Sequence, residues 1–120
     1  MGYYKDLMAY QKGYALAMKI FLITKKFPGD EKFSLVDQIR RSSRSVCTNL
    51  AEASMRKKYS DYFLSKLNDA STENCETEVW LRFAKDCGYL TDDEFSELNH
   101  LNAEIGKLLW FMMENPKKFT

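Results

Sequence analysis

A Glu-x-x-His segment, Glu97–His100, contains the only histidine of the 120-residue chain. Helical bundles that hold two iron ions use two such segments together with two further glutamates. Because there is no second histidine, one chain cannot complete that set of ligands. Both side chains also fall opposite the apolar stripe of the helix expected there. We therefore expect a solvated polar surface at this segment, with no metal and no cofactor.

The sequence offers equally little for nucleophilic catalysis. Cys47 lies near Arg40 and Arg44, which could lower the pKa of its thiol, but no base accompanies it. The five glycines are isolated from one another, so there is no glycine-rich loop to cradle a phosphate. We expect no catalytic residues, no enzymatic activity and no small-molecule substrate.

A ladder of polar side chains runs through the centre of the chain, beside an apolar stripe that includes Ile39, Val46 and Leu50. Its members are three or four residues apart: Gln38, Arg41, Ser45, Asn49, Glu52 and Arg56. A freely solvated face does not need such an ordered row of amides, hydroxyls and ions. Because buried polar groups require partners, we expect this polar ladder to be at least partly buried and hydrogen-bonded.

Two polar residues, Asn74 and Glu78, interrupt the apolar stripe of the segment 61–86. We expect both to face the polar ladder. Glu78 could serve as a catalytic carboxylate. The favoured interpretation is a buried partner for Arg41 or Asn49.

The charge is unevenly distributed, although the net charge of the chain is only +1. The segment Lys32–Lys58 contains seven basic and two acidic residues, a net +5, and the remainder has a net −4. Such a basic centre could attract an anion such as RNA. Alternatively, its lysines are solvated and its arginines form structural ion pairs. We find no run in which basic residues alternate with aromatic ones, as in single-strand binders.

Hydrophobic periodicity predicts four helices, over about 6–26, 34–55, 61–86 and 92–114. The apolar stripe of the first is formed by Leu7, Tyr10, Tyr14, Ala17, Met18 and Phe21, while Leu16, Ile20 and Ile23 lie off it. Gly88 is placed to end the third helix, and Thr91–Glu94 forms a capping box for the fourth. Short connections between four helices predict an all-α, antiparallel up-down-up-down bundle, a single domain over residues 1–120.

Several aromatic residues fall outside the predicted core stripes, namely Tyr62, Trp80, Phe83 and Trp110. A bundle core needs only one face of each helix, so we expect these residues to contact another copy of the chain or another protein. Scattered exposed apolar residues are also common in monomers, which leaves the simpler explanation open.

Three cysteines, Cys47, Cys75 and Cys87, are an odd number without metal-binding spacing. They are typical of buried thiols in a reducing compartment. The chain has neither a signal-peptide pattern nor an apolar run that could span a membrane. We expect a cytoplasmic protein without a membrane partner.

The segment Gln38–Ala53, QIRRSSRSVCTNLAEA, resembles the central motif of a bacterial family encoded in intervening sequences of 23S ribosomal RNA genes. Further segments agree in order, among them Lys5–Leu7, Thr24–Pro28 and Gly88–Leu90, so the resemblance covers nearly the whole chain. Ala53 departs from it, because the family usually has glycine at that position.

The resemblance implies a four-helix bundle that assembles into a homo-oligomeric ring, commonly a pentamer. The family is similar to the accessory variability determinant proteins of diversity-generating retroelements, which are basic barrels that bind nucleic acid and a reverse transcriptase. By that similarity the RNA-contacting residues would be Arg40, Arg44, Arg56, Lys57 and Lys58. The main hypothesis is thus an oligomeric module that binds RNA or a nucleoprotein. The alternative is a scaffold that docks a protein partner through exposed aromatic faces.

Overall fold

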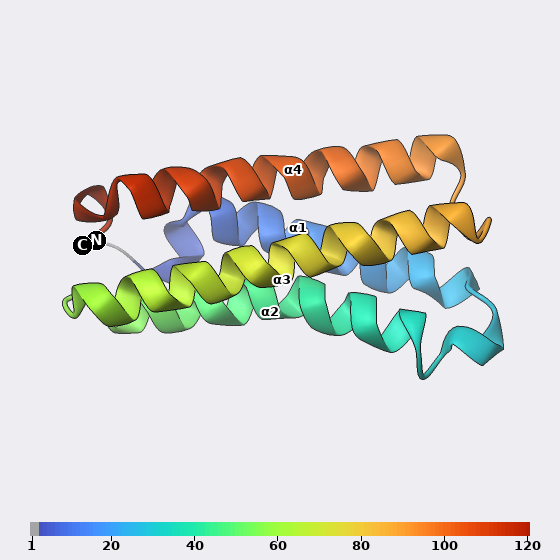
Figure 1. The fold of residues 1–120 in the computed structure, drawn as a ribbon, viewed down its shortest axis with the longest axis horizontal. Helices are drawn as coiled ribbons and strands as arrows, with labels where there is room; N and C mark the ends of the chain where they lie inside the picture. Colours follow the sequence, from blue (N-terminus) through green and yellow to red (C-terminus); the bar gives the residue numbers. More distant parts are fainter. Residues whose placement is uncertain (1–2) are drawn as a thin grey trace.

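The computed structural model describes residues 3–120, which form four long helices and no strand (Figure 1). The helices are α1 (Met8–Ile23), α2 (Leu35–Met55), α3 (Ser60–Asp86) and α4 (Asp92–Glu114). Each runs antiparallel to the next, and each packs on its two neighbours in a closed order in which α4 returns to α1. The predicted all-α antiparallel bundle is confirmed. No helix within residues 3–120 has both the length and the apolarity that crossing a membrane requires.

The bundle is elongated, and its two ends differ (Figure 1). The α2–α3 connection lies at one end, together with the start of α1 and the end of α4. The α1–α2 and α3–α4 connections lie at the other, which we call the distal end. The α1–α2 connection contains two short 3-10 turns, Thr24–Lys26 and Gly29–Glu31.

Local sequence explains the turn between α3 and α4. Gly88 has a φ of 80°, the only positive φ within residues 3–120. This conformation lets the Tyr89 amide donate to the Ala84 carbonyl at 2.9 Å and closes α3. The predicted capping box then begins α4: the Glu94 amide donates to the Thr91 hydroxyl, and the Thr91 amide donates to the Glu94 carboxylate.

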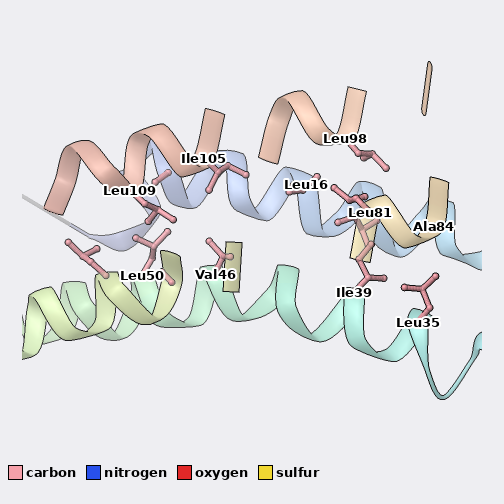
Figure 2. Packing of buried hydrophobic residues seen from close by; sticks show 14 of the residues in the cluster. Leu16, Leu35, Ile39, Val46, Leu50, Leu81, Ala84, Leu98, Ile105 and Leu109 are labelled. Carbon is pink, nitrogen blue, oxygen red and sulfur yellow. The ribbon is translucent and has the colours of Figure 1, made fainter. Parts of the chain in front are cut away.

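All four helices contribute to one apolar core along the bundle axis (Figure 2). Its largest fully buried apolar side chains are Ile20, Ile39, Leu50, Phe63, Leu67, Leu81, Ile105 and Leu109. The stripe predicted for the second helix is therefore in the interior. Burial of apolar area at about 25 cal/mol per Å² makes this core the main favourable term in folding.

In α1 only part of the predicted core stripe faces inward: Ala17 is buried and Tyr10 is partly buried against the core. Tyr14 and Met18, predicted to be core residues, are 55% and 43% exposed, whereas Leu16 and Ile20 are buried. The inward face contains Gly13, where an added Cβ would lie 3.4 Å from the Cys47 sulfur. At that distance a methyl group would be in van der Waals contact with α2, so this face of α1 lies directly against α2. Periodicity alone could not choose between two apolar faces on the same helix.

A second close approach joins α3 to α4 through a pair of asparagines. The Asn74 amide donates to the Asn102 side-chain oxygen at 2.9 Å, and the Asn102 amide donates to the Asn74 carbonyl at 3.1 Å. Asn102 is buried in the core stripe of α4. Beside this pair, a Cβ added to Gly106 would lie 2.8 Å from the Asn74 side-chain oxygen.

We expect the substitution Gly106→Ala to lower the free energy of unfolding by about 1–3 kcal/mol, because the new methyl group must displace the hydrogen-bonded Asn74 amide. At an unconstrained helix position the same substitution stabilises by about 0.5–1 kcal/mol. Denaturant unfolding in an Asn74→Ala background supplies the control. There Gly106→Ala should become neutral or stabilising, and the same loss in both backgrounds would contradict the explanation.

Candidate nucleic-acid interface

Three cations surround the ring of Phe21 near the end of α1. Lys25 Nζ and Arg40 Cζ each lie 4.8 Å from the ring centroid, and Arg44 Cζ lies at 5.8 Å. Arg40 is held in place, because its Nε donates to the Thr24 hydroxyl at 2.9 Å and its Nη2 to the Phe21 carbonyl at 3.3 Å. A guanidinium at the carbonyl end of a helix is favoured by the helix dipole. The sequence therefore builds a fixed cationic site where α1 ends against α2.

An open groove of about 490 Å³ continues from this cluster along α2. We call it the basic groove; its lining residues are Lys32, Phe33, Val36, Asp37, Arg40, Arg41 and Arg44. Lys32 Nζ lies 5.4 Å from the ring centroid of Phe33. The sequence shows no alternation of basic and aromatic residues, but in three dimensions two rings lie beside these cations: Phe33 lines the groove, and Phe21 contacts Arg40 and Arg44 from α1.

The cations of this surface divide into two kinds. Arg41 pairs with two carboxylates of α3. Its Nη2 donates to a Glu76 carboxylate oxygen at 2.7 Å, and both of its terminal nitrogens donate to Glu73 at 3.3 Å. The hydrogen bonds that Arg41 donates to Glu73, the charges of Glu73 and Glu76, and the bond that it donates to Glu76 outweigh desolvation and raise the pKa of Arg41.

The other cations are Lys25, Lys32, Arg40 and Arg44. Within residues 3–120 no carboxylate lies within ion-pair distance of any of these four. Their charge is therefore available to an anion from outside the chain.

The predicted RNA-contacting residues separate into two groups. Arg40 and Arg44 belong to the basic groove, whereas Arg56, Lys57 and Lys58 follow the end of α2. Arg56 lies twelve positions after Arg44, which corresponds to about 18 Å along a helix. Lys57 lines a separate hollow of about 320 Å³ with Lys117 and Lys118 of the carboxyl-terminal segment. The structure brings only Arg40 and Arg44 together, and adds Lys25 and Lys32 to them.

The polar ladder follows the edge between α2 and α3. Gln38, Ser45 and Asn49 are half-buried, and Arg41 and Glu52 are exposed. Glu52 reaches Lys66 of α3 at 2.8 Å. Asn49 instead donates to the Ser45 carbonyl within its own helix at 2.9 Å.

The expected partners on α3 were wrong. Glu78 pairs with Arg82 at 3.2 Å instead of with Arg41 or Asn49. Asn74 bonds to α4, and Glu78 lies one turn further along that same side of α3. Which acid of α3 meets Arg41 depends on the relative register of the two helices, which their separate periodicities do not specify.

Three buried hydroxyl groups form hydrogen bonds between α2 and α3 or within one of these helices. The sequence analysis did not identify them as hydrogen-bonding groups. Ser42 and Thr77 are fully buried and 2.9 Å apart. Either hydroxyl can donate the shared bond, since Thr77 also lies 2.9 Å from the Glu73 carbonyl and Ser42 lies 3.4 Å from the Ile39 carbonyl. Ser43 donates to the Ile39 carbonyl at 2.8 Å. The only sequence indication was the cluster of small residues beside the apolar stripe.

The residues that could have supported catalysis are separated from one another. Burial raises the pKa of the Cys47 thiol to about 11, the opposite of activation. His100 is exposed, with Glu104 at 3.9 Å, and Glu97 pairs with Lys19. Residues 3–120 contain no group of three His, Cys, Asp or Glu side chains that could hold a metal ion.

The predicted interface residues lie on two helices. On α3, Tyr62 and Phe83 are exposed and Trp80 is half-buried; on α4, Trp110 is 61% exposed. The sequence analysis missed a further exposed apolar surface on α1, formed by Met8, Tyr14, Met18 and Leu22. The indication was already present, because that helix is apolar on more than one side. Since α1 and α3 are diagonal in the bundle, the two surfaces face in different directions.

Comparison with known proteins identifies similar chains. A family model described as "23S rRNA-intervening sequence protein" matches residues 5–110. A crystal structure of a protein of unknown function from the S23 ribosomal protein family of Bacteroides thetaiotaomicron is similar, with a TM-score of 0.83 and 32% sequence identity. The match covers 92% of this chain and 98% of that one. No curated protein matches.

The cysteines give a direct test of the packing beside the basic groove. Cys47 is buried as expected, whereas the expectation of burial is wrong for Cys75 and Cys87, which are exposed. We expect a thiol reagent such as 5,5′-dithiobis(2-nitrobenzoic acid) to modify two thiols per folded chain at pH 8 and the third only after denaturant is added. The Cys47→Ala variant should leave the count in the folded state at two. A count of three in the native protein would contradict both the burial and the raised pKa of Cys47.

Proposed function

This chain belongs to the 23S rRNA-intervening sequence protein family, and from that premise we propose that it is a non-enzymatic, homo-oligomeric RNA-binding module. The observation that carries the proposal is the set of four cations in or beside the basic groove, Lys25, Lys32, Arg40 and Arg44, without a carboxylate partner within residues 3–120. No cofactor or small-molecule substrate is part of the proposal. The unpaired cysteines favour a cytoplasmic location.

Local charge matters more here than the net charge of +1. Phosphate contacts supply most of the affinity in sequence-independent nucleic-acid binding. Arg40 is already fixed by its bonds to Thr24 and Phe21, so little side-chain entropy is lost when it meets a phosphate. Arg44 lies one helical turn away on the same side of α2 and extends the row. The groove is thus suited to follow a phosphate backbone.

Self-association rests on the apolar surfaces of α1 and α3. One exposed patch would favour a two-fold dimer, in which the same surface meets itself. Two different patches on diagonal helices allow a head-to-tail contact, which closes into a ring when the rotation permits. A pentamer, as implied by the family resemblance, is such a ring. In a ring, the basic grooves of several copies would add to one field.

Docking of a different protein is the second candidate function. The exposed Trp110 and Phe111 on α4 support it, because these aromatic residues are typical of interface centres. The two candidates differ in their response to nuclease. If a partner protein still co-purifies with this chain after nuclease treatment, the result favours protein docking. If it no longer co-purifies, the result favours RNA binding.

Binding to a structured RNA should depend steeply on salt. If the four cations contact phosphates, the logarithm of the association constant should fall with the logarithm of salt concentration with a slope of about −3 to −4. Fluorescence anisotropy between 25 and 200 mM salt, roughly the range over which such contacts weaken, measures the slope. A flat response, or no binding at the lowest salt, would contradict RNA binding.

Charge reversal at Arg44 should weaken this binding by about tenfold or more and reduce the salt slope by about 1. Arg44 is exposed, and reversing its charge also removes repulsion among the cations around Phe21, so the variant should stay folded with a melting temperature no lower than that of the wild type. The matched control is Lys107→Glu, which makes the same charge change on the outer face of the diagonal helix α4. Equal losses for Arg44→Glu and Lys107→Glu would show that only total charge matters.

Sedimentation equilibrium should give a mass that is a multiple of the 14.1 kDa chain. A charge in the α1 surface, as in Met18→Glu, should shift the distribution toward monomer because it would bury an unpaired carboxylate. Thr48→Glu, on the outer face of α2, is the control and should leave the mass unchanged. A wild-type monomer at micromolar concentration would rule out the ring.

A further inference from the structure

We propose that the basic groove selects single-stranded RNA, with one unpaired base stacked on the ring of Phe33. This inference rests on the proposed RNA-binding function and adds the form of RNA and the residue that recognises it. Its first support is the position of Phe33 among the lining residues of the groove, next to Lys32 and facing the row of Arg40 and Arg44.

Phe33 is 85% exposed, the highest exposure of any large hydrophobic residue within residues 3–120. A large aromatic ring gains little stability for the fold at such a position. Base–aromatic stacking uses such a ring directly, and it tolerates any sequence because every base has a π face. The aromatic ring and the surrounding cations together match the composition of single-strand binding surfaces.

The ring projects from a connection that is firmly held. The Glu31 carboxylate accepts hydrogen bonds from the Ser34 hydroxyl at 2.6 Å and from the Tyr89 hydroxyl at 2.8 Å. It also accepts a longer bond from the Leu35 amide at 3.4 Å. Glu31 therefore ties the segment that carries Phe33 to the α3–α4 turn. A stacking platform fixed in this way loses little conformational entropy when a base binds.

Two hollows share Phe33 as a wall. One is the basic groove, and the other is a hollow of about 460 Å³ that Phe33 lines together with Trp80 and Phe83. The phosphates of a strand can follow the cations on one side, while the base of the same nucleotide turns toward the aromatic side. A base inside a duplex is already stacked on both faces and cannot make this contact. The geometry thus favours unpaired RNA over a duplex.

The test compares fluorescein-labelled 12-nucleotide oligouridine with a fully paired 12-base-pair RNA on the full chain at 50 mM salt. We expect the single strand to bind at least about tenfold more tightly per site. Phe33→Ala should weaken oligouridine binding by about tenfold or more, leave its salt slope unchanged and leave duplex binding unchanged. Thermal unfolding should not change, since the side chain is exposed.

Two further variants separate stacking from general apolarity. Phe33→Trp should restore the affinity for oligouridine, whereas Phe33→Leu should not, because leucine has no π face. Trp110→Ala removes another exposed aromatic residue, on the diagonal helix α4, and should have no effect.

The outcomes distinguish this inference from the function on which it rests. Steep salt dependence with equal affinity for both RNAs, or with no effect of Phe33→Ala, overturns base stacking and leaves phosphate binding intact. Absence of RNA binding at low salt overturns both. Binding of a 12-residue polyglutamate as tight as that of oligouridine would assign the groove to acidic peptides and overturn the inference.

Discussion

Hydrogen bonds buried between helices fix the register on which the rest of the bundle depends. The Ser42–Thr77 bond joins α2 to α3, and the Asn74–Asn102 pair joins α3 to α4. Leaving either set of polar groups without partners would cost about 1–3 kcal/mol for each group. An apolar core tolerates sliding of one helix along another, whereas these bonds allow only one alignment. The long helix α3, with 27 residues, is the shared reference for both of its neighbours.

This alignment explains why two adjacent arginines have different roles. Arg40 and Arg41 are about 100° apart on α2, so one faces α1 and the other faces α3. On the α3 side, the register places Glu73 and Glu76 beside Arg41, and the charge is neutralised within the bundle. On the α1 side, Arg40 meets the Phe21 ring and backbone and the Thr24 hydroxyl. The cationic surface is therefore the side of α2 that α3 does not neutralise.

Much of the fold could be predicted because its determinants are local. The core stripe of α2, the Gly88 turn and the Thr91–Glu94 capping box each depend on residues close together in sequence. The inward face of α1 could not be predicted, since Leu16 and Tyr14 lie on two apolar faces of comparable strength. The face that packs inward is the one with Gly13, Leu16 and Ile20, which the tertiary contacts of α1 with its neighbours determine.

Part of the candidate site could be predicted because some of its residues are close together in the sequence. The basic composition of the segment Lys32–Lys58 is visible in the sequence, and Arg40 and Arg44, one helical turn apart, line one groove. Their separation from Arg56 follows from helix length. The arrangement of Phe21 and Phe33 around these cations depends on how the α1–α2 connection folds back, which no local pattern encodes.

The three cations around Phe21 also have an energetic consequence. Their mutual repulsion opposes folding, so soluble multivalent anions such as sulfate should relieve this repulsion and raise the melting temperature of the bundle.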